Sequence, residues 1–554
     1  MKQRKSSGGN HKRSTCFKAN ACNMCFLLCK VKGANTKMKD YITIIGGGLA
    51  GSESAYQIAK RGIHVKLYEM KPTKFSPAHH NSNFAEIVCS NSFKSNLHTN
   101  ACGLLKEELR ILDSLLIKTA EATAVPAGQA LAVDREKFSE EITKKIESLK
   151  NVEIIRQEVG KNGDVKEEIQ TGLKEDKLKC EDKPSNNSLA CEKSVNNSVS
   201  NEDKSIRKVE LKSMTNEYSL KEMAKDGIVI IATGPLTSDN LSREIMEITG
   251  SQGLHFYDAA APIIEKESID MSIAFWGDRY SQERRKEESI DEWQKRIKEN
   301  KENNYINLPM NKEEYENFWK ELVNAEVVEL HSFEKKEIFE GCMPIEVMAK
   351  RGIDTLRFGP LKPVGFTDPR TGKRPYAIVQ LRQDNSEGNL FNMVGFQTNL
   401  KFGEQKRIFS LIPGLQNAEF TKYGVMHKNT FINSPELLDE TYKLKSNNNI
   451  FFAGQITGVE GYVESIASGL VAGLNAAMKF KKSLKIIFPK ETMIGALSKY
   501  IATENKNFQP MNANFGILPE LSEEIKDKKI KYKKLADRAV EKLKDIDHDI
   551  KIKL

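Results

Sequence analysis

A glycine-rich turn near the start of the chain has the residue types and spacing that bind phosphate. It fits the pattern G-x-G-x-x-G and consists of Gly46, Gly47, Gly48, Leu49, Ala50 and Gly51. The three patterned glycines permit a tight turn, a close approach of the backbone to a pyrophosphate, and close packing of a helix on a strand. The N–H groups and the positive dipole end of the following helix also attract phosphate. The turn therefore predicts a dinucleotide-binding site.

An acidic residue follows at the distance that such a site requires. Glu69 comes at about the expected 20 residues after the glycines and can accept hydrogen bonds from ribose hydroxyls. A carboxylate in this place is unfavourable for the 2′-phosphate of NADP. The sequence therefore favours FAD or NAD as the bound dinucleotide.

The segments around this turn have the pattern of a strand–helix–strand unit. Residues 41–45 are a short β-branched run, residues 49–59 have helical spacing, and residues 63–67 alternate as a second strand. The apolar run 227–234 predicts a strand that returns to this unit, and residues 449–478 predict a closing strand and a helix of small residues. These patterns predict an α/β protein with a Rossmann-like FAD-binding domain of the two-dinucleotide-binding flavoprotein type, with an inserted mixed α/β substrate domain.

The charge of the chain is unevenly distributed. The 554 residues include 85 Lys and Arg against 76 Asp and Glu, which gives a net charge of +9. Ten of the basic residues and none of the acidic ones lie in residues 1–39, so the rest of the chain carries 75 basic and 76 acidic residues. The body is therefore near neutral, and a nucleic-acid surface on it must be a local patch.

Hydrophobicity and cysteine usage indicate a cytoplasmic globular protein. No apolar run approaches the length that crosses a bilayer, so no membrane association is expected. The nine cysteines are scattered and odd in number, as expected of reduced thiols. Four of them lie in residues 16–29 at loosely metal-like spacing, but no partner pair completes a known pattern, and no metal site is predicted.

Shifts in composition predict the domain boundaries. Residues 1–37 are a basic extension, interpreted as disordered or upstream of a true start at Met38, although their composition also allows an organelle transit peptide. Lys, Glu, Asn and Ser dominate residues 156–225, which are interpreted as a low-complexity insert. The FAD-binding domain is expected in three parts, residues 38–155, 226–262 and 440–554. The inserted substrate domain is expected at residues 263–439.

Several long motifs together resemble one family. They are GGGLAGSESA, LYEMKP, SPAHHNSNFAEIVCSNS, LLKEELR, VPAGQALAVDR, FEGCMPIEVMA and FFAGQITGVEGYVESIASGLVAG, in this order. The chain resembles the folate- and FAD-dependent tRNA (uracil-5-)-methyltransferases of bacteria over most of residues 38–520. The related flavoprotein called glucose-inhibited division protein A shares the N-terminal fold, but the CSNS and GCMPIE segments favour the methyltransferase.

The resemblance implies that the T-loop uridine of tRNA is methylated at C5. The carbon comes from 5,10-methylenetetrahydrofolate, and FADH2, itself reduced by NAD(P)H, supplies the two electrons that convert the methylene to a methyl group. The C5 of uracil is a poor nucleophile until a group adds at C6, and a thiolate is a natural addend. By resemblance, Cys342 adds to C6, and Cys89 assists as a proton acceptor or as a second thiol.

The resemblance also assigns residues to the cofactor. Gly454, Gln455, Gly458 and Tyr462 are expected to border the flavin ring and ribityl chain, and Asp134 and Arg135 to border the dinucleotide. Three histidines, His79, His80 and His427, are candidates for contact with folate, substrate or phosphate, and equally for structural roles. No second glycine-rich pattern is visible, so NAD(P)H is expected to dock transiently over the flavin.

Two other classes of function compete with this interpretation. One is a related FAD-dependent enzyme of the tRNA wobble uridine or a small-molecule flavoprotein oxidoreductase, and the other is a flavin-binding scaffold without chemistry. A disulfide reductase would carry a C-x₂₋₄-C pair beside the first helix, which the sequence lacks. A scaffold would not need both Cys89 and Cys342.

Overall fold

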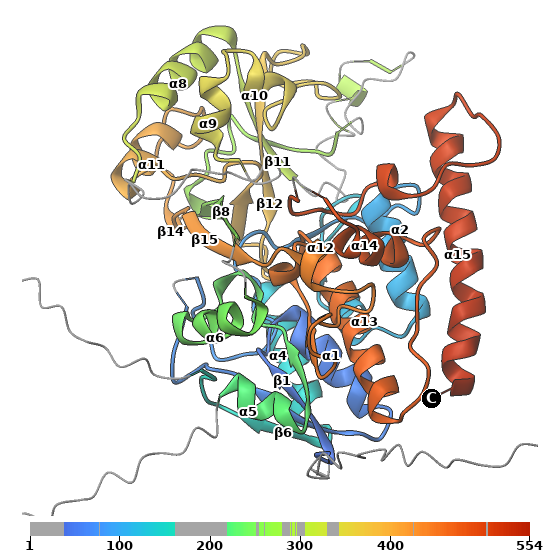
Figure 1. Ribbon diagram of the computed structural model, residues 1–554. Helices are drawn as coiled ribbons and strands as arrows, with labels where there is room; N and C mark the ends of the chain where they lie inside the picture. The colour runs from blue at the N-terminus through green and yellow to red at the C-terminus, as the bar shows by residue number, and fades with distance from the viewer. Residues whose placement is uncertain are drawn as a thin grey trace, which may run out of the picture. The chain divides into compact units, whose positions relative to one another are not determined.

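A parallel sheet forms where the sequence predicts buried strands (Figure 1). Its five described strands are ordered β16-β7-β1-β2-β6, and all neighbouring pairs are parallel. The central strands β1 and β7 are rich in buried isoleucine, as expected of a parallel sheet covered on both faces. The predicted Rossmann-like fold is confirmed. The strand bounds are β1 Tyr41–Ile45, β2 His64–Tyr68, β6 Val152–Ile155, β7 Ile228–Ile231 and β16 Ile450–Phe452.

The computed structural model describes most of the chain after residue 37. The described residues are 38–76, 78–160, 219–250, 254–259, 261–279, 288–289, 291–293, 295, 305–328, 343–424, 426–505 and 508–553. The predicted extension 1–37, residues 161–218 of the predicted insert and Cys342 lie outside them. Residues 219–225 of that insert are described, and the helix α5 (Leu220–Lys225) among them buries Leu220 and Met223.

The helix that begins within the glycine-rich turn packs closely against a helix from the C-terminal part of the chain. The two helices are α1 (Leu49–Ala59) and α13 (Tyr462–Phe480), which is the predicted helix of small residues. A Cβ on Gly469 would lie only 2.3 Å from the carbonyl oxygen of Ala50. The Ser54 hydroxyl donates to the Gly469 carbonyl at 2.7 Å. The small residues of α13 therefore allow its backbone to pack directly against α1.

Apolar residues recur at helical spacing from Leu104 to Leu116, but the structure has two helices there. They are α2 (Ala101–Ile111) and α3 (Leu115–Ala122), separated by Asp113, whose φ is +61°. The Ser114 side chain caps α3, and the buried Glu53 carboxylate accepts from the Ser114 hydroxyl at 2.9 Å and the Leu116 N–H at 3.1 Å. A carboxylate brought from α1 thus fixes a new helix start inside an uninterrupted helical pattern.

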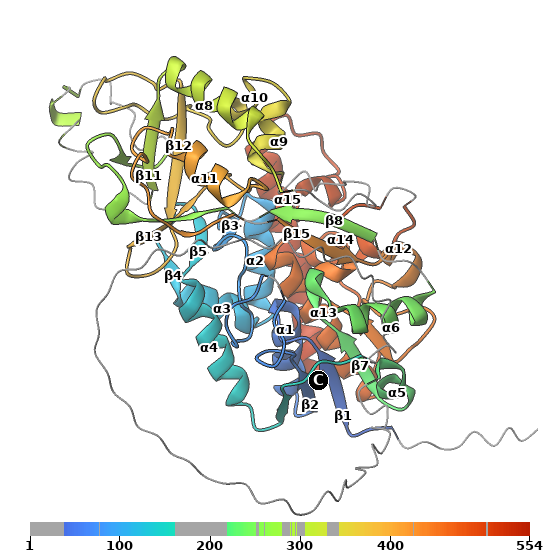
Figure 2. The ribbon, with the colours of Figure 1, turned by 90° about the vertical axis from the view of Figure 1, so that its left-hand side faces the viewer.

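A second, antiparallel sheet has its own hydrophobic core. Its described strands are ordered β10-β11-β12-β13-β9-β14, and Figure 2 shows the helices α8 to α11 gathered around β11 and β12. The strand bounds are β9 Ile263–Glu265, β10 Phe275–Trp276, β11 Tyr305–Met310, β12 Ala377–Gln383, β13 Leu390–Met393 and β14 Phe420–Lys422. The helix bounds are α8 Lys312–Asn324, α9 Ile345–Lys350, α10 Thr355–Phe358 and α11 Phe402–Phe409.

The chain enters and leaves this second sheet through two paired strands. They are β8 (Leu254–Ala259) and β15 (Met426–Phe431), which pair antiparallel. The residues between β8 and β15 are an insertion between two strands of the parallel sheet. In the sequence, β7 precedes β8, and β16 follows β15. One sequence interval therefore supplies the whole antiparallel sheet.

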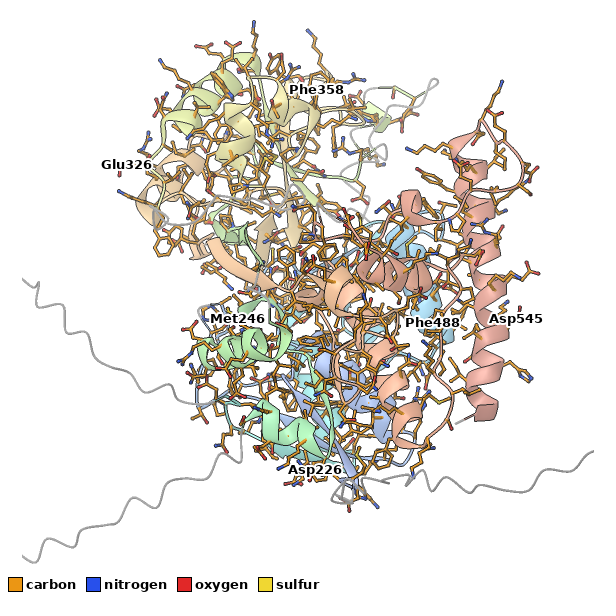
Figure 3. All side chains as sticks on the ribbon, in the orientation of Figure 1. Asp226, Met246, Glu326, Phe358, Phe488 and Asp545 are labelled. Carbon is orange, nitrogen blue, oxygen red and sulfur yellow. The ribbon has the colours of Figure 1, made fainter. Side chains whose placement is uncertain are left out.

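The remaining elements surround these sheets. A small sheet has the order β3-β5-β4. The start of the described chain is held by an ion pair between Lys39 and Asp226 at 3.1 Å, and Asp226 is labelled in Figure 3. None of the described helices has both the length and the apolar character needed to cross a membrane. The bounds are β3 Ser92–Ser95, β4 Ala124–Val125, β5 Ala130–Val133, α4 Arg135–Glu147, α6 Asp239–Thr249, α12 Ser434–Leu437, α14 Met493–Ala502 and α15 Lys528–Lys553.

Candidate active site

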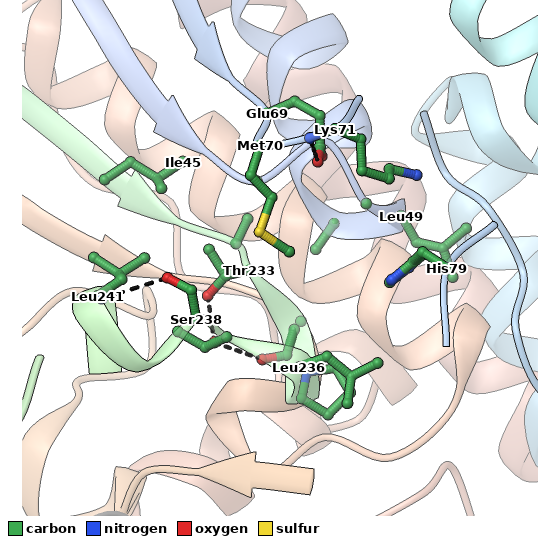
Figure 4. A pocket seen from close by; sticks show the side chains of 18 of the residues that line it. Ile45, Leu49, Glu69, Met70, Lys71, His79, Thr233, Leu236, Ser238 and Leu241 are labelled. Carbon is green, nitrogen blue, oxygen red and sulfur yellow. Dashed lines mark hydrogen bonds between the residues drawn. The ribbon is translucent and has the colours of Figure 1, made fainter. Parts of the chain in front are cut away.

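A pocket opens at the carboxyl ends of the parallel strands (Figure 4). It encloses about 1080 Å³ of empty space, its open mouth included. Ile45 from β1, Tyr68 from β2, Ala232 after β7 and Gly454 after β16 all line it. Open α/β sheets bind ligands in this place, outside the carboxyl ends of their strands.

The glycine-rich turn forms one wall of the pocket from backbone alone. A Cβ on Gly51 would lie 1.8 Å from the Gly46 carbonyl oxygen, so only glycine allows α1 to pack here. A Cβ on Gly48 would meet nothing within 4 Å, and Gly48 lines the pocket. Gly48 is also the N-cap of α1 and provides no side-chain cap. The first turn of α1 therefore offers its N–H groups to an anionic ligand.

Glu69 lies at the pocket wall just after β2, as the pattern predicts. Its side chain is buried, with one carboxylate oxygen accepting the Gly47 N–H at 2.8 Å and the other accepting the Lys71 N–H at 3.0 Å. These two bonds fix the carboxylate in one orientation. Each oxygen retains a further acceptor position, which suits a ligand hydroxyl.

A further part of the pocket wall comes from residues that follow β16, next to the glycine-rich turn. Gly454, Gln455 and Tyr462 line the pocket. Gly458 does not, and a Cβ there would lie 2.4 Å from the Phe508 ring, so its role in the described structure is close packing. The Gln455 side-chain amide donates to Glu460 at 2.9 Å, which orients it at the wall.

Cys89 lies beside this wall. It is half-buried, and its backbone N–H donates to the hydroxyl of the pocket residue Tyr462 at 3.1 Å. The structure therefore brings the SPAHHNSNFAEIVCSNS segment to the part of the pocket wall formed by α13, although Cys89 itself does not line the pocket. Cys342, the other predicted catalytic thiol, lies outside the described residues, and so does the side chain of His427.

Asp134 and Arg135 do not line the pocket in the described structure. Asp134 is the N-cap of α4, and its carboxylate also accepts the Ser386 N–H at 2.9 Å. Arg135 forms an ion pair with Asp384 at 3.0 Å and donates to the Ile87 carbonyl at 3.2 Å. Both residues thus bind the turn between β12 and β13 to the region of Cys89, while their predicted contact with the dinucleotide stays a prediction.

The two adjacent histidines have different surroundings. His79 lines the pocket, and its Nδ1 lies 2.5 Å from the Ser76 hydroxyl oxygen. His80 is exposed, and its backbone N–H donates to Glu86 at 2.8 Å. Of the two, only His79 is placed to touch a ligand in this pocket.

Sequence reasoning missed several residues that line the pocket. They are Met70, Lys71, Glu86, Val88, Gln157 to Val159, and Thr233 to Ser238. The Ala-Thr-Gly at the end of β7 was a usable signal, because the residues after a parallel strand face such a pocket. The same signal applies to Met70 and Lys71 after β2 and to Gln157 to Val159 after β6, whereas Glu86 and Val88 do not directly follow a strand of this sheet.

The chain is similar to a known protein family and to solved structures. The family described as "Glucose inhibited division protein A" matches residues 41–483. The solved structures of Aquifex aeolicus GidA in two crystal forms match with TM-scores of 0.57 and 0.58 at 15% and 16% identity. These matches cover 93% and 92% of this chain, and 74% and 76% of those chains. At such identity the likeness concerns the fold alone.

Curated relatives are much more similar. A protein of Acetivibrio thermocellus is 53% identical over 92% of this chain and 99% of its own length. A protein of Enterococcus faecalis is 51% identical over 91% of this chain and 98% of its own length. Both are named "Methylenetetrahydrofolate--tRNA-(uracil-5-)-methyltransferase TrmFO". The similarity spans nearly the whole of each relative.

Proposed function

The chain belongs to the glucose inhibited division protein A family and, within it, to the methylenetetrahydrofolate–tRNA-(uracil-5-)-methyltransferases, and we propose that it forms 5-methyluridine in the T loop of tRNA. The observation that carries this is the 53% identity that extends over 99% of a relative of that name. The resemblance read from the sequence motifs is confirmed by this similarity. The carbon comes from 5,10-methylenetetrahydrofolate, and the reaction takes place in the cytoplasm.

The pocket fits FAD. The open space in front of Gly48 and the N-terminus of α1 would hold the pyrophosphate, and the oriented Glu69 carboxylate would accept from the adenosine ribose. Gly454, Gln455 and Tyr462 would border the flavin end. When bound, FAD supplies the two electrons that reduce the carbon from methylene to methyl, and NAD(P)H restores them.

The thiols of the chain activate the uracil ring. Cys342 adds through sulfur to C6, and the electron pair of the C5–C6 double bond becomes available at C5 for the new carbon–carbon bond. Cys89 then removes the C5 proton: the C5–H bond breaks, the double bond re-forms, and the Cys342 sulfur leaves C6. The position of Cys89 beside Tyr462 at the pocket wall supports its part. For Cys342 the support is its place in the FEGCMPIEVMA motif.

The T arm is the proposed binding element of tRNA. The target uridine lies in the folded elbow of the molecule and must leave its stack to reach the thiols, at a cost of about a few kcal/mol. Residues 263–439, which contain the antiparallel sheet, are the proposed substrate domain, because the turn of this sheet that follows β12 lies against the Cys89 region.

A labelled-carbon assay tests this function. The purified protein is incubated with an unmodified tRNA transcript, NADPH and 5,10-methylenetetrahydrofolate carrying ¹³C in its methylene, and the RNA is digested and analysed by mass spectrometry. We expect ¹³C in 5-methyluridine from the T loop. Label in the wobble uridine would favour the related wobble-modifying enzyme, and oxidation of NADPH without labelled RNA would favour a small-molecule oxidoreductase.

A further inference from the structure

Three basic side chains from three different elements surround the Cys89 segment. Arg135, on α4, donates to the Ile87 carbonyl at 3.2 Å. Arg382, on β12, donates to the Ser90 hydroxyl at 2.6 Å and to the Asn91 side chain at 2.9 Å. These contacts bind the segment on both sides of Cys89. Lys422, at the end of β14, is the third cation, and its pKa is lowered by burial and by the charge of Arg135 and raised by that of Cys89.

The cations at this site outnumber the carboxylates that pair with them. Arg135 pairs with Asp384, but its Nη2 is buried and has no hydrogen-bond partner among the described residues. Arg382 is buried, and within the described part of the chain neither it nor Lys422 forms an ion pair. The nearby Glu86 is already paired with Lys71 at 3.1 Å. An unbalanced positive charge at a buried place favours an anion next to it.

Burial is the largest single influence on the pKa of each of the three cations. Burial lowers the pKa of Arg382, and burial followed by the charge of Arg135 lowers the pKa of Lys422. For Arg135, burial acts to lower the pKa, but Asp384, Tyr462 and Cys89 together raise it above its ordinary value. Cys89 acts on all three pKa values in the direction that favours the charged cation.

We propose that Arg135, Arg382 and Lys422 are positioning residues that hold Cys89 as a thiolate at neutral pH, a role in catalysis that rests on the proposed function. Ionisation releases the thiol proton to solvent, and the anion then neutralises part of the positive charge around it. The other titratable groups that face this site or lie next to it are Asp384, Glu86, Lys71, Tyr305, Tyr462 and Asp278. Cations next to a cysteine lower the pH at which its thiolate forms, and the thiolate is its reactive state.

A Cys89 thiolate suits the proton transfer that the reaction needs. As an anion it accepts the C5 proton directly, with the S–H bond forming as the C5–H bond breaks. A thiol at the same place would first have to lose its proton to another base. Because Arg135 and Arg382 both hydrogen-bond to residues within two positions of Cys89, they also fix where the sulfur lies.

The test measures the ionisation of Cys89 without any substrate. The flavin-loaded protein is treated briefly with iodoacetamide from pH 5 to pH 10, and the alkylated Cys89 peptide is quantified by mass spectrometry. The difference in thiolate absorbance near 240 nm between the wild type and Cys89→Ser gives the same midpoint if the reagent does not reach the sulfur. We expect a midpoint well below the value of about 8.5 for a free cysteine.

Charge-removing variants identify the cause. Lys422→Gln removes a positive charge without removing an ion pair among the described residues. Arg135→Gln removes a positive charge together with the ion pair to Asp384. Each is expected to raise the midpoint by about one pH unit, a tenfold change in the thiolate-to-thiol ratio, while Arg135→Lys stays close to the wild type. Lys137→Gln is the matched control, because Lys137 lies on the same helix and pairs with Glu387 of the same turn at 3.0 Å.

A midpoint at or above that of the unfolded protein, or one that Lys422→Gln and Arg135→Gln leave unchanged, would overturn the inference. A low midpoint in a protein that fails the labelled-carbon assay would leave the inference in place and refute the proposed function. A normal midpoint in a protein that forms 5-methyluridine would refute the inference and leave the proposed function in place.

Discussion

The two parts of the proposed active site differ in composition. The end of the pocket proposed to hold phosphate consists of backbone at Gly48 and at the N-terminus of α1, together with one oriented carboxylate, Glu69. The Cys89 end is made of side chains that come from α4, β12 and β14 and carry an excess of positive charge. The first part should therefore be sensitive to added volume, and the second to removed charge and removed sulfur.

Removal of sulfur should have the largest effect. Cys342→Ala should abolish methyl transfer, and Cys89→Ala should slow it by roughly 10²–10⁴-fold, the usual worth of a positioned proton acceptor. FAD content and NADPH oxidation should persist in both, because reduction of a flavin needs no thiol. The measurements are methyl transfer to tRNA, flavin absorbance and NADPH consumption.

Cys102→Ala is the matched control for the thiol variants. Cys102 is buried on α2, and its thiol donates to the Phe93 carbonyl at 3.4 Å. Burial raises the pKa of this thiol to about 11, which makes it a poor nucleophile. Loss of methyl transfer in Cys102→Ala similar to that in Cys89→Ala would contradict the assignment.

Added volume at the glycine turn should separate binding from folding. Gly48→Val places a side chain in open space in front of the α1 N-terminus, so the protein should fold and lose FAD. Gly51→Val drives a Cβ into the Gly46 carbonyl oxygen at 1.8 Å and should cost about 3 kcal/mol or more of stability. Flavin absorbance and thermal unfolding of both variants check this. A Gly48→Val protein with stoichiometric FAD would refute the placement of the dinucleotide.

A buried acid without a cation provides the contrast to Cys89. The Glu108 carboxylate accepts the backbone N–H groups of Met493 and Ile494 at 2.7 and 2.8 Å, and it has no ion pair within the described residues. Burial raises its pKa from 4.5 to about 8, against the two hydrogen bonds. Burial without a cation thus favours the protonated form of Glu108, whereas the proposed cations around Cys89 favour the ionised form of its thiol.

The raised pKa of Glu108 predicts how stability changes with pH. Between pH 4.5 and 8 the folded protein keeps a proton on Glu108 that the unfolded chain has lost. Stability therefore falls as the pH rises through this window, by about 1.4 kcal/mol per pH unit from this group. Thermal unfolding over this range should show a flatter curve for Glu108→Gln, with exposed Glu140→Gln as control. Parallel curves for Glu108→Gln and the wild type would contradict the prediction.

Removal of residues 1–37 should have the smallest effect. The predicted motifs begin at Tyr41, and the described chain is already fixed by Lys39, which pairs with Asp226. A protein that begins at Met38 should keep its FAD content and its rate of methyl transfer. If it folds but binds tRNA more weakly, with a flatter salt dependence, the basic segment contacts phosphates.

The contrast between the two parts of the site also decides what a sequence can predict. The strands at Tyr41–Ile45 and His64–Tyr68, the glycine turn and Glu69 lie within 30 residues, and local geometry dictates them. Arg382 and Lys422 carry no motif, and only the pairing of the second sheet brings them to Cys89. The start of α3 likewise depends on a distant residue, Glu53 from another helix.

Covalent trapping of tRNA tests the central claim most directly. A T-arm minihelix with 5-fluorouridine at the target position is incubated with the protein, 5,10-methylenetetrahydrofolate and NADPH, and the products are run on a denaturing gel. Fluorine cannot leave C5 as a proton does, so the RNA should stay attached to the thiol that added at C6. The wild type should give a shifted band and Cys342→Ala none. Equal trapping by Cys342→Ala would contradict this account and make Cys89 the nucleophile.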